Sequence, residues 1–422
     1  MNAALLPAVR AALGAAGSGP ETCAWFVPGR IEVLGKHTDY AGGRSLVCAV
    51  EQGFVVVAAA RADDIVRVID VAAKEQVELP LVEGVETLPD GWRRYPATVV
   101  HRVARNFPSA RRGADVAFLS DLPLASGMSS SSALMVSIFL ALSGVNRLDE
   151  ADAYRREISS AEDLAGYLAT VENGHSFGAL TGDGGVGTFG GSEDHTAMLC
   201  CAPGRLSQYS FCPVRRERDV ACPGDRRFVV AVSGVRAEKT GAAKEAYNRA
   251  SLAARAILDL WRAASGRDDR SLAQAVERAG AAEVRAAVER APAGRFTTPV
   301  LLDRFDQFFA ESFEIVPAAS DALSRGDSAA FGRLVDRSQA LAERKLGNQV
   351  PETMALARTA RELGADAASA FGAGFGGSVW ALVADEAAAA FARNWERAYR
   401  AAFPRVEPAF LVTGAGDAAA RI

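Results

Sequence analysis

Hydrophobic and polar positions follow different patterns in the first and the second half of this chain. The first 120 residues are rich in short runs of Val and Ile, which are typical of strands, and two such runs occupy residues 54–61 and 65–72. Asp63 and Asp64 lie between these runs, so we expect the two strands to pair as a hairpin. Further elements expected in this half are a helix at residues 92–107 and a strand at residues 115–119.

The strongest helical pattern of the first half covers residues 133–142, and Gly144 and Asn146 are typical stop signals after it. Residues 151–171 predict another helix, and the many glycines of residues 174–191 indicate a loop. The first half is therefore a mixture of strands and helices.

Helical patterns dominate the second half. Residues 227–233 (RFVVAVS) predict a buried strand, and residues 241–364 have the Ala, Arg, Glu and Leu content of helices. Glycines and a strand return at residues 370–382, and residues 386–403 predict a final helix. Each half thus contains one glycine cluster next to regular elements.

The length of 422 residues predicts two lobes, which we divide as residues 1–225 and 226–422, around a shared cleft in an α/β (α+β) fold. Hydrophobic residues make up 49% and charged residues 23% of the chain, which is the balance of a globular protein with a sizeable core. The net charge of -4 provides no general attraction to nucleic acid or to anionic membranes, so neither is an expected partner.

Six cysteines without a C-x-x-C pair and four scattered histidines argue against a disulfide framework and against zinc. No apolar run reaches 18 residues, so we expect no membrane span, and the first residues lack the pattern of a signal peptide. We therefore expect a cytoplasmic protein, whose oligomeric state, monomer or homodimer, the sequence leaves open.

A glycine and four serines directly precede the predicted helix of residues 133–142. The N-terminus of a helix carries exposed N–H groups and the positive end of the helix dipole, and it binds anions. A serine hydroxyl at such a place is also able to ligate Mg²⁺ that bridges phosphate oxygens. The alternative without a ligand is an ordinary serine N-cap after a loop, but four serines favour a nucleotide-phosphate site. The ATP-binding candidates here are Gly127, Ser129, Ser130, Ser131 and Ser132.

Residues 28–43, PGRIEVLGKHTDYAGG, carry more polar side chains than a buried strand satisfies without partners. One interpretation is an exposed loop, and the other is a polar ligand site. The short side chain of Asp39 suits the recognition of hydroxyl groups, and Arg30 suits the charge that develops on a transferred phosphoryl group.

Other glycine patterns are less informative. Residues 182–187 and 372–377 match G-x-G-x-x-G, but neither segment lies between a strand and a helix, so dinucleotide binding is not expected. Gly35 and Lys36 look like the end of a P-loop, yet the glycine spacing is one residue too long and His37 follows in place of Ser or Thr. This segment is therefore not a Walker A motif.

Three segments together resemble the galactokinase branch of the GHMP kinase superfamily. They are residues 29–43, residues 123–134 (PLASGMSSSSAL) and residues 371–377 (FGAGFGG), and their order and separation agree as well. The resemblance implies a bilobal GHMP-kinase fold with a mixed-sheet N-terminal lobe and a helix-rich C-terminal lobe. It also implies an enzyme that phosphorylates the anomeric hydroxyl of a sugar, with ATP and Mg²⁺ as cofactors and a small-molecule sugar as partner.

The resemblance assigns roles to single residues. Arg30 would stabilise the transferring phosphoryl group, and His37 and Asp39 would contact sugar hydroxyls. Trp92 resembles a family tryptophan near the nucleotide base, although a core position is an equal interpretation. The loop that contains Gly374 would close over the site beside the phosphates.

The catalytic aspartate of the family lies in a Gly-x-Met-Asp-Gln-like motif. Residues 190–195 (GGSEDH) fit this motif best, which makes Asp194 the candidate that accepts or orients the sugar proton and Gly191 a candidate sugar contact. Asp183 is the alternative aspartate. We expect residues 196–200 to follow as a strand.

Metal and further sugar contacts also follow from the resemblance. Ser131 would be the Mg²⁺ ligand, and Glu172, at the end of a predicted helix, is a candidate second ligand. Tyr247 is a candidate sugar contact from the second lobe.

Galactokinases carry a glutamate between Gly35 and His37 that contacts the C6 hydroxyl of the sugar, whereas this chain has Lys36. Because an ammonium group attracts carboxylate or phosphate, one hypothesis is an anionic substrate, such as a uronic acid or a sugar phosphate. The alternative is that Lys36 points away or pairs with Glu32. For the whole protein, the alternatives are a non-catalytic galactokinase-like sensor of sugar and ATP, or another small-molecule GHMP kinase.

Overall fold

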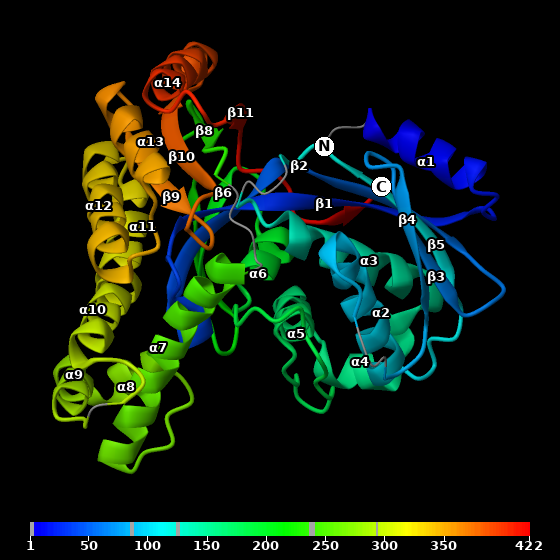
Figure 1. The fold of residues 1–422 in the computed structure, drawn as a ribbon, viewed down its shortest axis with the longest axis horizontal. Helices are drawn as coiled ribbons and strands as arrows, with labels where there is room; N and C mark the ends of the chain where they lie inside the picture. Colours follow the sequence, from blue (N-terminus) through cyan, green and yellow to red (C-terminus); the bar gives the residue numbers. More distant parts are fainter. Residues whose placement is uncertain (1–3, 85–87, 124–126, 236–240, 293) are drawn as a thin grey trace.

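The chain folds around two β-sheets, against which most of its helices pack (Figure 1). This computed structural model describes residues 4–84, 88–123, 127–235, 241–292 and 294–422. Part of the predicted serine-rich segment, residues 124–126, lies outside the described residues. Within these ranges, no helix has both the length and the apolar character needed to cross a membrane.

The first sheet has eight strands, in the order β12-β1-β2-β5-β3-β4, and β6 and β7 extend it from β2. Its two longest strands, β1 and β2, are buried over most of their length. The strands are β1 (Glu21–Leu34), β2 (Arg44–Ala60), β3 (Ile65–Asp70), β4 (Glu75–Pro80), β5 (Ala114–Ser120), β6 (Arg205–Ser210), β7 (Arg215–Ala221) and β12 (Ala420–Arg421).

The predicted hairpin of residues 54–61 and 65–72 is wrong. These residues form the end of β2 and the strand β3, but β5 lies between them, antiparallel to β2 and parallel to β3. β3 turns back into β4 instead. The Val and Ile pattern identified the strands, whereas the pairing depends on a third strand that follows much later in the chain.

Helices cover both faces of this sheet. α1 (Leu5–Ala15) packs Val9 and Leu13 on one face, and Figure 1 shows it on the opposite side from α2 (Arg94–Asn106) and α3 (Ser130–Asn146). α3 is buried on nearly all sides and continues through Gly144, where a Cβ atom would lie 2.6 Å from Sγ of Cys23. Gly144 therefore makes room for the sheet and does not stop the helix.

Two further predictions about the first half need correction. Residues 151–171 form two helices, α4 (Asp152–Glu157) and α5 (Ala161–Asn173), because Oγ of Ser160 accepts a hydrogen bond from the backbone N–H of Asp163 and starts a new helix. Residues 196–200, expected as a strand, belong to α6 (Glu193–Cys200), which packs on β1 and β2. A short apolar run does not distinguish a buried strand from a buried helix.

The second sheet has four antiparallel strands, in the order β11-β8-β10-β9. They are β8 (Arg226–Val232), β9 (Ala367–Phe371), β10 (Ser378–Ala384) and β11 (Ala409–Thr413). The helices of this half are α7 (Gly241–Ser265), α8 (Leu272–Ala279), α9 (Ala281–Glu289), α10 (Thr298–Phe309), α11 (Val316–Ser324), α12 (Ser328–Leu341), α13 (Pro351–Glu362) and α14 (Ala388–Ala402). α13 and α14 cover one face of this sheet.

The division at residues 225 and 226 stays a prediction. β7 ends at Ala221 in the first sheet and β8 begins at Arg226 in the second. The short strand β12, at the end of the chain, returns to the first sheet and pairs with β1. Both sheets therefore contain residues from the last part of the sequence.

Candidate active site

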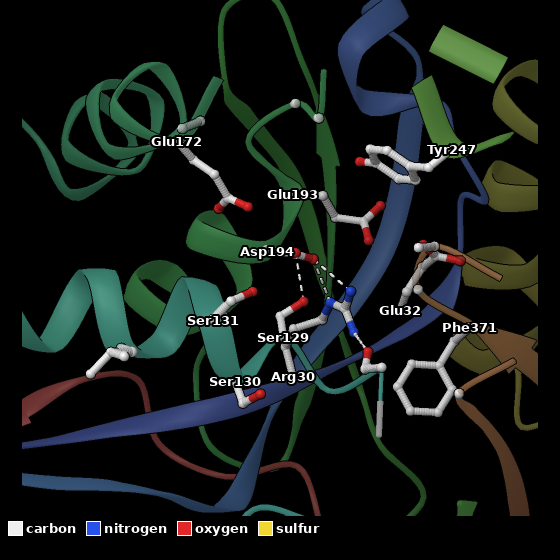
Figure 2. A pocket seen from close by; sticks show the side chains of 18 of the residues that line it. Arg30, Glu32, Ser129, Ser130, Ser131, Glu172, Glu193, Asp194, Tyr247 and Phe371 are labelled. Atoms are coloured by element: carbon white, nitrogen blue, oxygen red, sulfur yellow. Dashed lines mark hydrogen bonds and ion pairs between the residues drawn. The ribbon is translucent and has the colours of Figure 1, made fainter. Parts of the chain in front are cut away.

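A pocket of about 320 Å³ lies where the three sequence motifs meet. Its walls come from β1 and the turn after it, and from the start of α6. Two further walls are the turn at residues 127–132, called the serine turn, and the loop at residues 372–377 between β9 and β10, called the glycine loop. Figure 2 shows Asp194 in the middle of the pocket, with Ser129 and Ser131 on one side of it and Glu193 and Tyr247 on the other.

An ion pair between Arg30 and Asp194 forms the centre of the pocket. The guanidinium group is buried, and its Nε and Nη2 atoms lie 2.7 and 2.6 Å from Oδ1 of Asp194. Its Nη1 donates to the carbonyl oxygen of Gly127 at 2.5 Å. Arg30 extends from β1 and Asp194 from the first turn of α6, so two distant segments hold the carboxylate in one orientation before a substrate binds.

The serine turn lies directly beside this ion pair. Gly127 and Ser129 both have positive φ angles, of 70° and 55°, which bend the chain into the start of α3 at Ser130. Oγ of Ser129 donates to Oδ2 of Asp194 at 2.5 Å. The first N–H groups of a helix have no partner within the helix, and here they lie at the pocket together with Ser130 and Ser131. This arrangement suits phosphate groups.

Ser132 differs from Ser129, Ser130 and Ser131 because it does not line the pocket, and its side chain is fully buried. Its Oγ donates to Oε2 of Glu172 at 2.8 Å and lies 3.4 Å from Oδ2 of Asp194. The prediction that Ser132 contacts ATP is therefore corrected for its side chain, which orients the Glu172 carboxylate instead.

Ser131 and Glu172, the two predicted Mg²⁺ ligands, both line the pocket. A hydroxyl and a carboxylate are oxygen donors, and Mg²⁺ in nucleotide sites binds one or two such protein ligands together with substrate phosphates. The hydrogen bond from Ser132 fixes one oxygen of Glu172. The residues present thus fit a magnesium ion.

His37 links the first motif to the glycine loop. Its Nδ1 lies 3.0 Å from the hydroxyl of Tyr40, and its Nε2 lies 3.0 Å from the carbonyl oxygen of Ala373. The Tyr40 hydroxyl accepts from Arg304, so it donates to Nδ1 and the ring proton is assigned to Nε2. Burial, reinforced by the nearby Arg304 charge, lowers the pKa of His37 to about 4. The ring is neutral at physiological pH and contacts Tyr247, with ring centroids 5.2 Å apart.

Asp39 and Gly191 are in direct contact on the same side of the pocket. The carboxylate of Asp39 accepts from the backbone N–H of Tyr40 at 2.8 Å and from that of Glu193 at 3.1 Å. A Cβ atom at Gly191 would lie 2.4 Å from Oδ2 of Asp39, so glycine is required there. Burial raises the pKa of Asp39 to about 6, because the charged form loses its hydration.

Trp92 and Phe118 are two aromatic side chains of the pocket wall. Trp92 packs edge-on against Phe118, with ring centroids 5.8 Å apart, and its Nε1 donates to Glu75 at 2.8 Å. Gly374, in the glycine loop, also lines the pocket, and a Cβ atom there would lie 2.3 Å from the carbonyl oxygen of Asn348. An aromatic wall beside a phosphate site suits a nucleobase.

Lys36 is the predicted substrate contact that the structure places outside the pocket. Its side chain is 1% exposed, and Nζ donates to Oγ of Ser369 at 2.7 Å and to Oγ of Ser338 at 3.0 Å. Ser338 donates in turn to Glu311 at 2.9 Å, so a hydroxyl connects the ammonium group to a carboxylate. The expectation that Lys36 reads an anion on the substrate is therefore corrected, because its ammonium group is engaged with the second half of the chain.

Asp183, the alternative catalytic aspartate, also lies outside the pocket, 3.7 Å from Nη1 of Arg105. The other predicted site residues line the pocket together: they are Arg30, His37, Asp39, Trp92, Gly127, Ser129, Ser130, Ser131, Glu172, Gly191, Asp194, Tyr247 and Gly374.

Sequence reasoning missed two acids, Glu32 and Glu193, which are both buried and both line the pocket. A signal for Glu32 was present, because it follows Arg30 by two residues and side chains two apart share a face of a strand. The expectation of a strand at residues 196–200 concealed Glu193, which lies in the first turn of a helix.

Three family profiles match separate parts of the chain, and each match contains one of the three motifs. The galactokinase galactose-binding signature matches residues 15–60, the N-terminal domain of GHMP kinases matches residues 94–183, and their C-terminal domain matches residues 319–401.

Similar proteins are found among curated sequences and solved structures. A galactokinase of Chloroflexus aurantiacus is 30% identical over 94% of this chain and 93% of its own. A galactokinase of Actinobacillus pleuropneumoniae is 39% identical over 113 residues, which are 27% of this chain, and the chain spans only 29% of the length of that relative. The crystal structure of Lactococcus lactis galactokinase with galactose is similar with a TM-score of 0.73 at 22% identity, over 95% of both chains. Methanococcus jannaschii mevalonate kinase has a TM-score of 0.55 at 12% identity, over 93% of this chain and 98% of its own.

The mixed α/β fold, with a serine turn at the head of a buried helix, defines a kinase of the GHMP class, as expected from the sequence. Similarity to the Chloroflexus protein along nearly the whole chain, together with the galactose-binding signature, identifies the branch of this class. The chain belongs to the galactokinase family, a family of ATP-dependent sugar kinases.

Proposed function

We propose that this protein transfers the γ-phosphoryl group of ATP to the anomeric hydroxyl of galactose or of a closely similar neutral sugar. The observation that carries the proposal is the setting of Asp194. Its carboxylate is held by Arg30 and by the hydroxyl of Ser129, and it lies between the serine turn and the residues around Asp39.

In this proposal Asp194 accepts the proton of the attacking hydroxyl, or orients that hydroxyl while Arg30 balances the charge. The N–H groups at the start of α3 and the guanidinium of Arg30 stabilise the charge that develops on the transferring group. Mg²⁺ held by Ser131 and Glu172 would neutralise charge on the phosphate oxygens of ATP.

Different parts of the pocket fit the two substrates, ATP and the sugar. The wall formed by Trp92 and Phe118 suits the adenine base, and the glycine loop around Gly374 lies beside the phosphate site. Asp39 and Tyr247 offer hydrogen-bond partners for sugar hydroxyls. Both ring nitrogens of the neutral His37 are engaged by Tyr40 and Ala373, so His37 contributes the ring surface at this end of the pocket.

A neutral sugar has more support than a uronic acid or a sugar phosphate. Among the described residues that line the pocket, Arg30 is the only lysine or arginine, and it is paired with Asp194. Three more acids, Glu32, Asp39 and Glu193, surround the space where the sugar would bind. An anionic substituent would meet these carboxyl groups without a cation to compensate it.

The test is ADP release by the purified protein with ATP and Mg²⁺, using galactose, other neutral hexoses, galacturonic acid and galactose 6-phosphate as acceptors. We expect galactose or a similar neutral hexose to be the preferred acceptor and phosphorus NMR to locate the new phosphate at C1. ADP release that no sugar stimulates, although ATP and sugar bind, would favour a sensor. We also expect the reaction to take place in the cytoplasm, where ATP is available.

A further inference from the structure

Glu32 lies one strand repeat beyond Arg30, on the same face of β1. Arg30 pairs with Ala49 and Glu32 with Val47 across β2, without an irregularity between them. The two side chains are therefore about 6.6 Å apart along the strand and point in the same direction. The start of α6 covers this face, so that Asp194 meets Arg30 while Glu193 lies beside Glu32.

Hydrogen bonding distinguishes the two neighbouring glutamates. Glu193 accepts a hydrogen bond from the hydroxyl of Ser45. Glu32 is only 4% exposed and lines the pocket. The Glu193 carboxyl group hydrogen-bonds to the carboxyl group of Glu32, whose Oε1 atom has no donor among the described residues. An acceptor that is buried without a donor loses its hydration without compensation, and a bound hydroxyl group would recover this loss.

The position of Glu32 shows which part of a substrate would reach it. The phosphoryl group is transferred near Arg30, Asp194 and the serine turn. Figure 2 shows Glu32 on the other side of Asp194, toward Tyr247 and away from Ser131. A hydroxyl that meets Glu32 is thus a different one from the hydroxyl that attacks ATP.

We propose that Glu32 is a specificity-determining residue that accepts a hydrogen bond from an acceptor-sugar hydroxyl other than the one that is phosphorylated. This inference rests on the proposed function. The ligand chemistry is that of a neutral polyol, because a carboxylate or phosphate at this place would lie against both Glu32 and Glu193.

The experiment combines Glu32→Ala and Glu32→Gln with a series of monodeoxy sugars, based on the hexose that the wild-type protein phosphorylates fastest. We expect one deoxy sugar to have a kcat/KM at least tenfold below that of its parent with the wild-type protein. With Glu32→Ala, this sugar and its parent should differ less than twofold, while the penalties for the other deoxy sugars persist. Glu32→Gln keeps the shape and one carbonyl oxygen, so it should retain part of the penalty.

Asp70 supplies the matched control, because it lines the same pocket and is paired in the sheet with Phe118, which contacts Trp92. Asp70→Ala removes a pocket acid at the base end and should leave every deoxy-sugar penalty as in the wild-type protein. The KM for ATP of Glu32→Ala should stay within twofold of the wild-type value.

Calorimetric binding of the same sugars separates the two proposals. Sugar binding without turnover by the wild-type protein would count against the kinase reaction, and the deoxy series would then be read as dissociation constants. If every deoxy penalty persists in Glu32→Ala, in turnover and in binding, Glu32 does not read a sugar hydroxyl. A wild-type protein that binds no sugar would overturn both proposals.

Discussion

The proposed phosphate end and the proposed sugar end of one pocket are built in different ways. At the proposed phosphate end, Gly127, Ser129, Ser130 and Ser131 belong to one short segment, and their backbone N–H groups and hydroxyls lie at the start of one helix. At the proposed sugar end, Glu32 and Asp39 come from one segment, whereas Glu193 and Tyr247 come from two others far away in the chain. A local motif is sufficient for a phosphate, whereas a sugar contacts groups that only tertiary packing brings together.

The two ends also differ in charge. The serine turn presents dipoles and hydroxyls to an anion, whereas the sugar end presents carboxyl groups, of which Asp39 and Glu32 have pKa values raised by burial, to about 6 and about 7. Arg30 and Asp194 form the boundary. Substitutions that change one end only will therefore show whether the two ends of the pocket work independently.

The largest effect on activity is expected for a substitution of Asp194, at the boundary between the two ends of the pocket. Asp194→Asn removes the acceptor of the hydroxyl proton but keeps the shape, so kcat should fall about 10²- to 10⁴-fold while both substrates still bind. Steady-state kinetics and calorimetry measure the two quantities. Asp183→Asn is the matched control, because that aspartate pairs with Arg105 outside the pocket, and its kcat should stay within about twofold of wild type. Equal losses in both variants would contradict the assignment.

Lys36→Glu should destabilise the fold behind the proposed sugar end, although Lys36 does not line the pocket. The substitution buries a carboxylate near Glu311 in place of an ammonium group with two serine partners, so the free energy of unfolding should fall by about 3–5 kcal/mol. Denaturant unfolding measures this loss. Lys74→Glu, a change of the same charge at an exposed position, should cost less than about 0.5 kcal/mol. A stable Lys36→Glu variant with a changed preference for acidic sugars would restore Lys36 as an anion reader.

Ser131→Ala should weaken the phosphate end alone. Loss of the hydroxyl should raise the Mg²⁺ concentration for half-maximal activity about tenfold or more, because the proposed ligand of the metal is removed. The KM for the sugar should hardly change. Ser137→Ala deletes a hydroxyl that bonds to the carbonyl oxygen of Ala133 within the same helix, and it should leave the Mg²⁺ requirement unaltered. A matching rise in both variants would point to damage of α3.

The smallest effect should come from acidification at the sugar end. Asp39 has a pKa of about 6 and must be ionised to accept hydrogen bonds from two sugar hydroxyls, so the KM for the sugar should rise about tenfold between pH 7 and pH 5. In Asp39→Asn the KM should be high and should rise less between pH 7 and pH 5 than in the wild-type protein, because the contribution of Asp39 is absent while Glu32 still titrates. A wild-type KM that stays constant over this range would contradict the role of Asp39.

The same pKa has a consequence for stability. Because the folded state holds the proton of Asp39 more tightly than the unfolded chain, its contribution to stability is complete below the ordinary pKa of 3.8 and is lost as the pH rises through about 6. Thermal unfolding of wild type and Asp39→Asn across this range measures that loss, which the substitution should remove.

Much of the site was predictable because its motifs are local. The serine turn, the polar segment around Arg30 and Asp39, and the glycine loop are each continuous in sequence, and their residues line one pocket. Lys36 could not be placed in this way. Its side chain points to Ser338 and Ser369, whose positions depend on packing of the second half against the first.

The pairing of strands was equally beyond local reasoning. The Val- and Ile-rich runs revealed β2 and β3, but the strand between them, β5, comes from a later segment. In the same way, the apolar residues after Asp194 became the helix α6 because they pack on β1 and β2, although their short pattern is compatible with a strand.

The sequence by itself determined most of the elements, the serine turn before α3 and the membership of a kinase family, because these depend on propensities and on contiguous motifs. Only the tertiary structure decided that Lys36 supports the fold, that Ser132 orients Glu172, and that Glu32 faces the pocket. The physical reason is that burial and hydrogen-bond partners are set by residues far away in the chain. The chemistry of an acid or a cation in this pocket follows from those partners.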